Sequence, residues 1–331
     1  MRELILLGES LTSLLYAAGS SKYGKLEIVD IWEGGSLLYG WKLTAPTQLK
    51  CIDRVPILCN ERTQIEEIGG KPIAIELNVS FIGSEEEYKN KITLDSEVEI
   101  QRDWILEYSN SKYYVMGGWC NIFNRLRSRI KVPRIYGELQ TVLPRDQTLI
   151  VRGLRIRYDA VLNTLPLPYI LDKIADKELS DFLEPLRYVS FYITSLIIKR
   201  QLNHLRVTYV GKRGYLLAAV VELPVSYLVN DLGNYIIVYC FVPISLGKLR
   251  AELFQKVLTE LRKLRIIESY SDIIAERSYF ERYGLLGVIS SYSINYIIKE
   301  LKKHDIYLGG RLGLWQEKSI SEIISSASKL L

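Results

Sequence analysis

The chain has 331 residues, of which 48% are hydrophobic and 24% are charged, which is ordinary for a soluble globular protein. Its length favours one large domain or two interleaved domains, and no apolar run reaches the roughly 18 residues that a bilayer-spanning helix needs. The net charge of +5 is modest. Because no aromatic-interleaved basic motif or helix-turn-helix pattern accompanies it, we expect no nucleic-acid partner.

Cysteine and histidine usage limits the chemistry further. Four cysteines without a CxxC pair and two histidines make a metal site improbable on composition, so we expect none. Cys51 and Cys59 could pair, but buried free thiols are the expected state. The N-terminus lacks the basic region and small-residue cleavage site of a signal peptide, which predicts a cytoplasmic protein. Richness in Ile, Leu, Tyr, Lys and Arg, with little His and Met, is typical of a thermophilic source.

The first predicted elements are a strand, a helix and a second strand. Residues Glu3 to Leu7 form an apolar run that ends at Gly8, which is typical of a buried parallel strand. Apolar residues then recur at helical spacing until Gly19, and "KLEIVDI" predicts a strand with Asp30 near its end. A strand, a tight turn, a helix and a strand with an acid about twenty residues after the turn is the dinucleotide-binding layout.

The middle of the chain alternates between sheet and helix patterns. Residues 53–110 are mixed and polar and predict a small sheet of their own. Residues 117–130 predict a helix with a double glycine at its start. Residues 148–159 predict a hairpin that turns at Gly153, and residues 160–164 predict a buried strand that two prolines stop.

The C-terminal half combines a sheet with three helices. Several apolar or alternating runs between residues 183 and 242 predict an antiparallel sheet. Residues 245–267 predict an amphipathic helix. A second helix over 293–304 precedes a strand over 305–310 and a terminal helix over 319–331.

Basic residues cluster in residues 121–134 and 151–159. A solvated face is the simpler explanation of each cluster. A site for an anionic substrate or cofactor is the alternative.

Four pieces, in this order, resemble the flavin-containing amine oxidase and protoporphyrinogen oxidase group, whose wider superfamily includes UDP-galactopyranose mutase and the Rab GDP-dissociation inhibitors. The pieces are "GESLTS…VD…EGG", "YYVMGGWCNIFNRL", "IRYDAVLNTLPLPYIL" and "IYLGGRLGLWQEKSISEII". The resemblance implies an α/β fold, with a Rossmann-like FAD/NAD(P)-binding domain built from discontinuous segments and a second α+β substrate domain that contains an antiparallel sheet. It assigns residues 1–45, 111–168 and 284–331 to the FAD-binding domain, and residues 46–110 and 169–283 to the substrate domain.

The resemblance also implies how the opening turn would bind FAD. Gly8 matches the first glycine of the family's GxGxxG turn, whereas Ser10 and Ser13 replace the second and third. Asp30 matches the acid that accepts hydrogen bonds from the ribose hydroxyls. Glu9 would bring a negative charge next to the pyrophosphate unless it points to solvent. The alternatives are an ordinary strand–turn–helix without a ligand and a merely solvated aspartate.

Three further segments match cofactor contacts of the family. A double glycine lets the backbone pass close to the pyrophosphate and the ring, a residue after the central helix touches adenine, and a closing GR-x-G approaches the pyrophosphate again. The matched residues are Gly34 and Gly35, Val132, and Gly310, Arg311 and Gly313. Ser321 stands where the family often has an acid, and Trp315 is expected in the core.

The resemblance implies an FAD-dependent oxidoreductase that acts on an organic small molecule, and the basic clusters leave an anionic substrate as an open alternative. No catalytic residue can be named from the sequence, which agrees with chemistry that the flavin itself carries. Two alternatives stay open. One is a non-redox flavoprotein similar to the UDP-sugar mutase, and the other is a relative without cofactor that serves as a binding or carrier module.

Overall fold

The computed structural model describes residues 3–19, 25–31, 40–41, 51–93, 99–100, 112–183, 186–229, 234–244, 252–288 and 294–329. The chain divides into two compact units. Unit 1 comprises Met1–Tyr39, Phe123–Arg187 and Val288–Leu331, and unit 2 comprises Gly40–Ile122 and Tyr188–Gly287. Within the ranges above, no helix has both the length and the apolar character that crossing a membrane requires.

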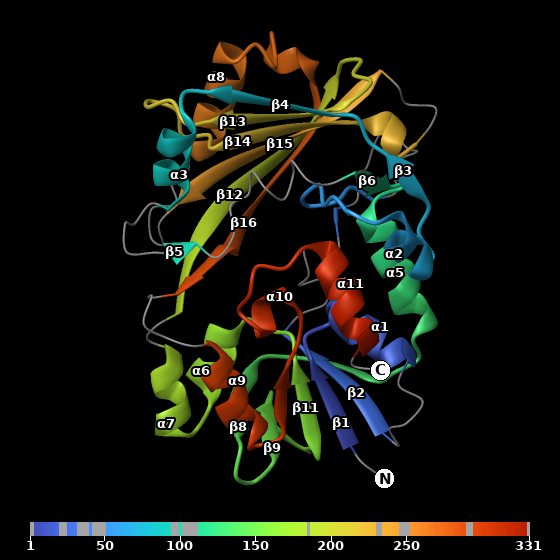
Figure 1. The fold of residues 1–331 in the computed structure, drawn as a ribbon, viewed down its shortest axis with the longest axis vertical. Coiled ribbons are helices and arrows are strands. Elements are labelled where there is room, and N and C mark those ends of the chain that lie inside the picture. Colours follow the sequence, from blue (N-terminus) through green and yellow to red (C-terminus); the bar gives the residue numbers. More distant parts are fainter. Residues whose placement is uncertain are drawn as a thin grey trace. The chain divides into compact units, whose positions relative to one another are not determined.

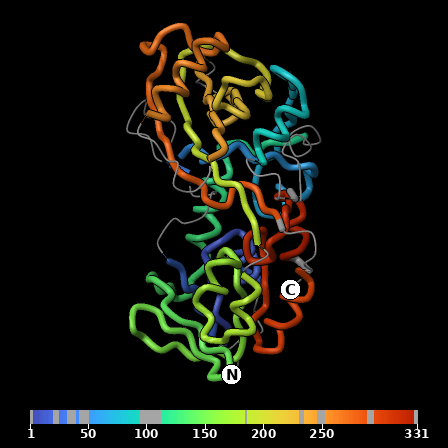
Figure 2. The backbone as a smooth tube through the Cα atoms, turned by 90° about the vertical axis from the view of Figure 1, so that its left-hand side faces the viewer, coloured from blue at the N-terminus to red at the C-terminus, as the bar shows by residue number. Residues whose placement is uncertain are grey.

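Unit 1 is built on a five-stranded sheet in the order β17-β11-β1-β2-β7, in which every pairing is parallel (Figure 1). Its strands are β1 (Glu3–Leu7), β2 (Lys25–Asp30), β7 (Arg134–Tyr136), β11 (Ala160–Asn163) and β17 (Ile306–Leu308). They come from the beginning, middle and end of the chain, which the blue, green and red tube of this unit shows (Figure 2). The predicted Rossmann-like core of discontinuous segments is therefore confirmed.

The helices that lie wholly in unit 1 are α1 (Leu11–Gly19), α6 (Leu167–Lys173), α7 (Lys177–Ser180), α9 (Ile294–Lys302), α10 (Gly310–Gly313) and α11 (Ile320–Lys329), with the 3₁₀ helix η2 (Asp181–Leu183). Helices α1 and α11 pack against each other (Figure 1). Leu14 of α1 and Ala327 of α11 are fully buried, as expected where an apolar stripe meets its neighbour.

A second, antiparallel sheet of unit 1 joins β8 (Leu139–Leu143), β9 (Thr148–Val151) and β10 (Leu154–Arg157). Its β9–β10 hairpin turns at Gly153, which has a φ of +78°, as predicted. Strand β8 was not predicted from the sequence.

Unit 2 contains a seven-stranded sheet in the order β4-β13-β14-β15-β12-β16-β5. Its strands are β4 (Leu77–Ile82), β5 (Glu99–Ile100), β12 (Leu186–Lys199), β13 (Leu205–Val210), β14 (Ala219–Pro224), β15 (Tyr235–Ile244) and β16 (Ile273–Val288). Strands β13, β14, β15 and β12 pair antiparallel, which confirms the predicted antiparallel sheet. Strand β4 joins its edge in parallel with β13, so residues 53–110 do not form only a small sheet of their own.

The remaining elements of unit 2 are short, except for one amphipathic helix. They are α2 (Arg62–Glu67), α3 (Glu85–Thr93), β3 (Pro72–Ala74) paired with β6 (Tyr113–Val115), α8 (Leu253–Lys263), and the 3₁₀ helices η3 (Val225–Tyr227) and η4 (Tyr270–Asp272). Helix α8 buries Val257 and Leu261 in one hydrophobic cluster with Val238 and Cys240 of β15. The predicted helix over 245–267 contains α8, but residues 245–251 lie outside the described residues.

Helix α5 (Trp119–Arg129) begins in unit 2, at a buried acid. Asp53 accepts hydrogen bonds from the backbone N–H groups of Trp119 (3.0 Å) and Cys120 (2.8 Å), and from the Tyr114 hydroxyl. These N–H groups lack intrahelical partners, so the carboxylate satisfies the helix start. Burial raises the pKa of Asp53 above that of an ordinary aspartate, although the three hydrogen bonds oppose the shift.

The cysteines differ from the expectation at one pair. Cys51 and Cys120 form a disulfide across a sequence separation of 69 residues, whereas Cys59 and Cys240 are buried and free. The prediction of a free thiol is therefore confirmed for Cys59 and was wrong for Cys51. Sequence spacing does not reveal that the fold brings residue 51 to the start of α5.

Candidate functional site

The turn after β1 depends on the absence of a side chain at Gly8. Its φ is +90°, and its N–H group donates to the carbonyl oxygen of Val29 at 2.8 Å. A Cβ atom here would lie 2.7 Å from the Oγ1 of Thr164 and 3.1 Å from the backbone nitrogen of Leu165. Glycine is therefore required both by the backbone conformation and by the close approach of the segment after β11.

Both serines that replace glycines have their hydroxyls in local hydrogen bonds. Ser10 Oγ accepts a hydrogen bond from the Ser13 N–H group at 3.2 Å, as an N-cap residue does. Ser13 is fully buried; its hydroxyl donates to the Gly8 carbonyl at 2.6 Å and lies 3.0 Å from Thr164 Oγ1. The third position of the turn thus holds a side chain because its hydroxyl has partners inside the strand–helix contact.

The start of α1 has the features of an anion site. Among the described residues, nothing accepts a hydrogen bond from the backbone N–H groups of Ser10, Leu11 and Thr12. Such groups at a helix N-terminus, together with the helix dipole, favour a phosphate. Since Gly8 also leaves the turn free of a side chain, the residues present fit a diphosphate.

Asp30 lies beside this turn at the end of β2. Its carboxylate accepts hydrogen bonds from the N–H groups of Glu9 (2.7 Å) and Ile31 (2.6 Å), and the residue is 6% exposed. The pKa of Asp30 is raised above that of an ordinary aspartate, mainly because burial removes water from the carboxylate. The charge of Glu9 also raises this pKa, whereas the two hydrogen bonds lower it. The structure therefore places the predicted ribose-binding acid directly against the turn.

Glu9 does not point to solvent. Its side chain is fully buried, and its carboxylate pairs with Arg127 Nε at 3.0 Å and with Arg134 Nε at 2.5 Å. The Tyr136 hydroxyl donates to the same carboxylate at 3.1 Å and accepts a hydrogen bond from Arg127 at 2.6 Å. We call Glu9, Arg127, Arg134 and Tyr136 the clasp. It neutralises the acid that the sequence had placed beside the diphosphate turn, and both arginines come from the predicted basic cluster 121–134.

The closing segment reaches the same edge of the sheet. Gly310 has a φ of +68°, and a Cβ atom there would lie 3.1 Å from Thr12 Oγ1. A Cβ atom at Gly313 would lie 2.3 Å from the carbonyl oxygen of Asn163. Both glycines are thus required by close packing against α1 and the end of β11. Arg311 makes a two-pronged ion pair with Glu317, at 2.8 and 2.7 Å.

The other residues predicted from the resemblance lie partly inside and partly outside the described residues. Val132 is half-buried, and its carbonyl accepts a hydrogen bond from Arg134 at 3.2 Å. Gly34 and Gly35 lie outside the described residues. Trp315 is fully buried, as expected of a core residue. Ser321, also buried, lies in the first turn of α11, which Ser319 and Glu322 cap.

Sequence reasoning missed Thr164 and the clasp. Thr164 closes the turn through its hydroxyl, which donates to the carbonyl oxygen of Leu7 at 2.9 Å. A threonine directly after the buried strand "AVLN" was the available signal, because side chains at the carboxyl ends of parallel strands meet at one edge.

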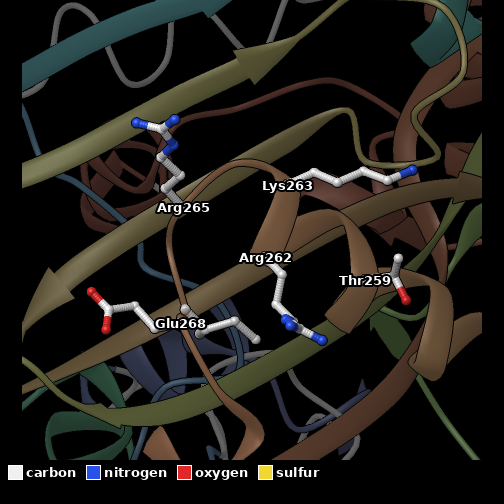
Figure 3. Close-up of a pocket in the computed structure, with 6 residues that line it drawn as sticks. Thr259, Arg262, Lys263, Arg265 and Glu268 are labelled. Atoms are coloured by element: carbon white, nitrogen blue, oxygen red, sulfur yellow. The ribbon is translucent and has the colours of Figure 1, made fainter.

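Unit 2 contains an open surface hollow of about 520 Å³ at the end of α8, lined by Thr259, Arg262, Lys263, Arg265, Ile267 and Glu268. Its charged side chains spread in different directions around the helix end rather than converging (Figure 3). Cations at a helix C-terminus are accounted for by the helix dipole. We therefore assign no ligand to this hollow. Among the described residues, no three His, Cys, Asp or Glu side chains are grouped so that they could hold a metal ion.

Known proteins resemble the chain in structure rather than in sequence. No protein-family model and no curated protein sequence matches it. A structure of reduced UDP-galactopyranose mutase superposes with a TM-score of 0.78 over 99% of this chain and 94% of its own, at 10% identity. A fatty acid isomerase from P. acnes has a TM-score of 0.70 at 9% identity, and a putrescine oxidase variant has 0.69 at 9% identity; each match covers 99% of this chain and 97% of the other. The chain therefore shares the fold of these solved structures, among them the UDP-galactopyranose mutase to whose superfamily the four sequence pieces pointed.

Proposed function

We propose that the chain is an FAD-dependent oxidoreductase that transfers a hydride between an organic small molecule and the flavin. One observation carries the proposal. At one edge of the parallel sheet, a glycine turn leaves the N–H groups of Ser10, Leu11 and Thr12 without acceptors among the described residues, directly beside the carboxylate of Asp30. This is the arrangement that binds the diphosphate and ribose of a dinucleotide.

Each part of this edge has a distinct role in the proposal. The N–H groups at the start of α1 hold the diphosphate, and Gly8 keeps the approach open. Asp30 accepts hydrogen bonds from the ribose hydroxyls. Gly310 and Gly313 let the closing segment lie close to α1, beside the diphosphate. Gly34, Gly35, Val132, Arg311, Ser10 and Ser13 complete the proposed cofactor set.

Flavin supplies the redox step when it is bound. The protein binds and orients the flavin and the substrate, and it keeps water away from them. We assign FAD to unit 1 and the substrate, a small organic molecule, to unit 2. A cytoplasmic location stays part of the proposal. The disulfide is compatible with it in a thermophile, because intracellular disulfides occur in hyperthermophiles.

A non-redox reaction on a nucleotide sugar is the second candidate. The fold similarity to UDP-galactopyranose mutase favours it over other non-redox chemistries. Calorimetric titration of the reduced protein with UDP-sugars separates the two candidates. A protein that acts on nucleotide sugars releases or absorbs heat as they bind, whereas an oxidoreductase whose substrate is unrelated to UDP-sugars shows no heat of binding.

The test of the first candidate is a visible absorption spectrum of the purified protein, before and after titration with FAD. We expect one flavin per chain and weaker binding by Asp30→Asn. Glu138→Gln provides a matched control, because Glu138 is an exposed acid of unit 1 outside the proposed site. Protein that is colourless and takes up no FAD contradicts the proposal and favours a binding or carrier module.

A further inference from the structure

The clasp lies next to the N–H groups at the start of α1, since Glu9 directly precedes Ser10 in the chain. Its carboxylate opposes the binding of an anion there, and its two arginines offset that charge. We propose that Arg134 sets the affinity of the turn for a diphosphate by neutralising Glu9, without touching the anion itself. Arg134 is then a positioning residue. The inference rests on the proposed function, because it concerns the same diphosphate site.

The bonds of Arg134 leave it little freedom to contact a ligand. Its Nε donates to Glu9 Oε1 at 2.5 Å, its Nη1 to the carbonyls of Ile130 and Val132 at 3.2 Å each, and its Nη2 to the carbonyl of Arg127 at 2.9 Å. These bonds use most of the guanidinium N–H groups. Two of the carbonyls lie at the end of α5, where the helix dipole favours a cation.

Glu9 is tied to the turn at both of its ends. Its backbone N–H group donates to Asp30, and its carboxylate is held by Arg127, Arg134 and Tyr136. Tyr136 is the register partner of Asp30 in the sheet, so Arg134 and Tyr136 of the clasp lie on β7, the strand next to the one that ends in the proposed ribose-binding acid. A change in the charge of the clasp therefore acts directly on the diphosphate turn.

The charges of the clasp make the proposal quantitative. One carboxylate and two guanidinium groups give a net charge of one positive unit. Arg134→Gln lowers this to zero, Glu9→Gln raises it to two, and the double variant restores it. As a scale, two unit charges about 12 Å apart, at an effective dielectric constant of about 20, change a binding constant about tenfold.

The experiment is calorimetric titration of the full chain with inorganic pyrophosphate, with thermal unfolding of each ligand-free variant as a check of folding. We expect Arg134→Gln to bind about tenfold more weakly than wild type and Glu9→Gln about tenfold more tightly. The double variant should return to within about threefold of wild type. Arg155→Gln, an exposed site on β10 of the same unit, is the matched control and should change affinity less than about twofold.

Three results overturn the proposal. A double variant as weak as Arg134→Gln shows that Arg134 contacts the anion directly. Unchanged affinity in Glu9→Gln shows that the acid does not act on the site, and this holds even where Arg134→Gln fails to fold. Wild-type protein that binds no pyrophosphate removes the anion site altogether. Wild-type protein that binds pyrophosphate but not FAD contradicts the proposed function and leaves the clasp to be judged by its variants.

Discussion

Gly8→Ala tests the tight approach of the segment after β11 to the turn after β1. The substitution places a methyl group on a backbone with a φ of +90°. That methyl carbon lies 2.7 Å from Thr164 Oγ1, within van der Waals contact, and 3.1 Å from Leu165 N. Two separate penalties therefore apply, one from the backbone conformation and one from steric overlap.

The structure sets the size of each penalty. A non-glycine residue in the left-handed region costs about 1–2 kcal/mol. To avoid the overlap, Thr164 must move, although its single hydroxyl proton is shared between the carbonyl oxygens of Leu7 (2.9 Å) and Gly8 (3.1 Å). Losing this hydrogen bond costs about 1 kcal/mol. Gly8→Ala should therefore lower the free energy of unfolding by about 2–3 kcal/mol.

Urea unfolding measures this loss, and Gly153→Ala isolates the steric part. Gly153 lies in the same unit with a φ of +78°, and a Cβ atom there meets nothing within 4 Å. Its replacement should cost only the backbone penalty of about 1–2 kcal/mol. The reasoning is refuted if the two variants differ by less than about 0.5 kcal/mol, the range of changes that touch no specific feature.

Three further predictions concern other parts of the molecule. Arg265 follows the end of α8 with a φ of +57°, a conformation that favours glycine. The free energy of unfolding of Arg265→Gly should therefore be about 1 kcal/mol higher than that of Arg265→Ala, which loses the same charge. Equal free energies in urea unfolding contradict this. Reducing Cys51–Cys120, which closes a span of 69 residues, should lower stability by about 4 kcal/mol, whereas reductant should leave a variant with serine at both positions unchanged. Because burial raises the pKa of Asp30, FAD affinity should decline as the pH falls toward that raised value, above the range of an ordinary aspartate. Asp30→Asn should show a flat profile, and a decline that persists in it points to another group.

The raised pKa of Asp30 also has a consequence for stability. Its folded-state pKa exceeds its unfolded value, so the folded chain binds this proton more tightly than the unfolded chain does. The resulting stabilisation is complete at pH values below the unfolded pKa and is lost as the pH rises through the folded one.

Local signals were enough to predict the opening of unit 1. An apolar run that ends at Gly8, a helical repeat and a strand ending in Asp30 are all short-range patterns, and the structure contains β1, α1 and β2 there. The short helices α2 and α3 were missed, because one or two turns carry too little periodicity to be recognised. Helix α3 begins with three glutamates, in the mixed and polar segment for which only a small sheet was predicted.

Long-range pairings could not be predicted in the same way. Glu9 meets Arg127 and Arg134 across 118 and 125 residues, and nothing in the local sequence of any of them specifies the partner. Cys51 and Cys120 illustrate the same limit, since connectivity follows from the fold and not from spacing. From the sequence, Arg127 and Arg134 are most simply explained as part of a solvated basic face. Only the sheet order, in which β7 lies beside β2, reveals that they meet Glu9.

The most direct test of the central claim, that a dinucleotide binds at the Gly8 turn, is hydrogen–deuterium exchange with and without FAD. We expect slower exchange of the backbone N–H groups of Ser10, Leu11 and Thr12 in the presence of FAD, because a bound diphosphate becomes their acceptor. FAD that binds while exchange at these three residues stays unchanged would contradict it.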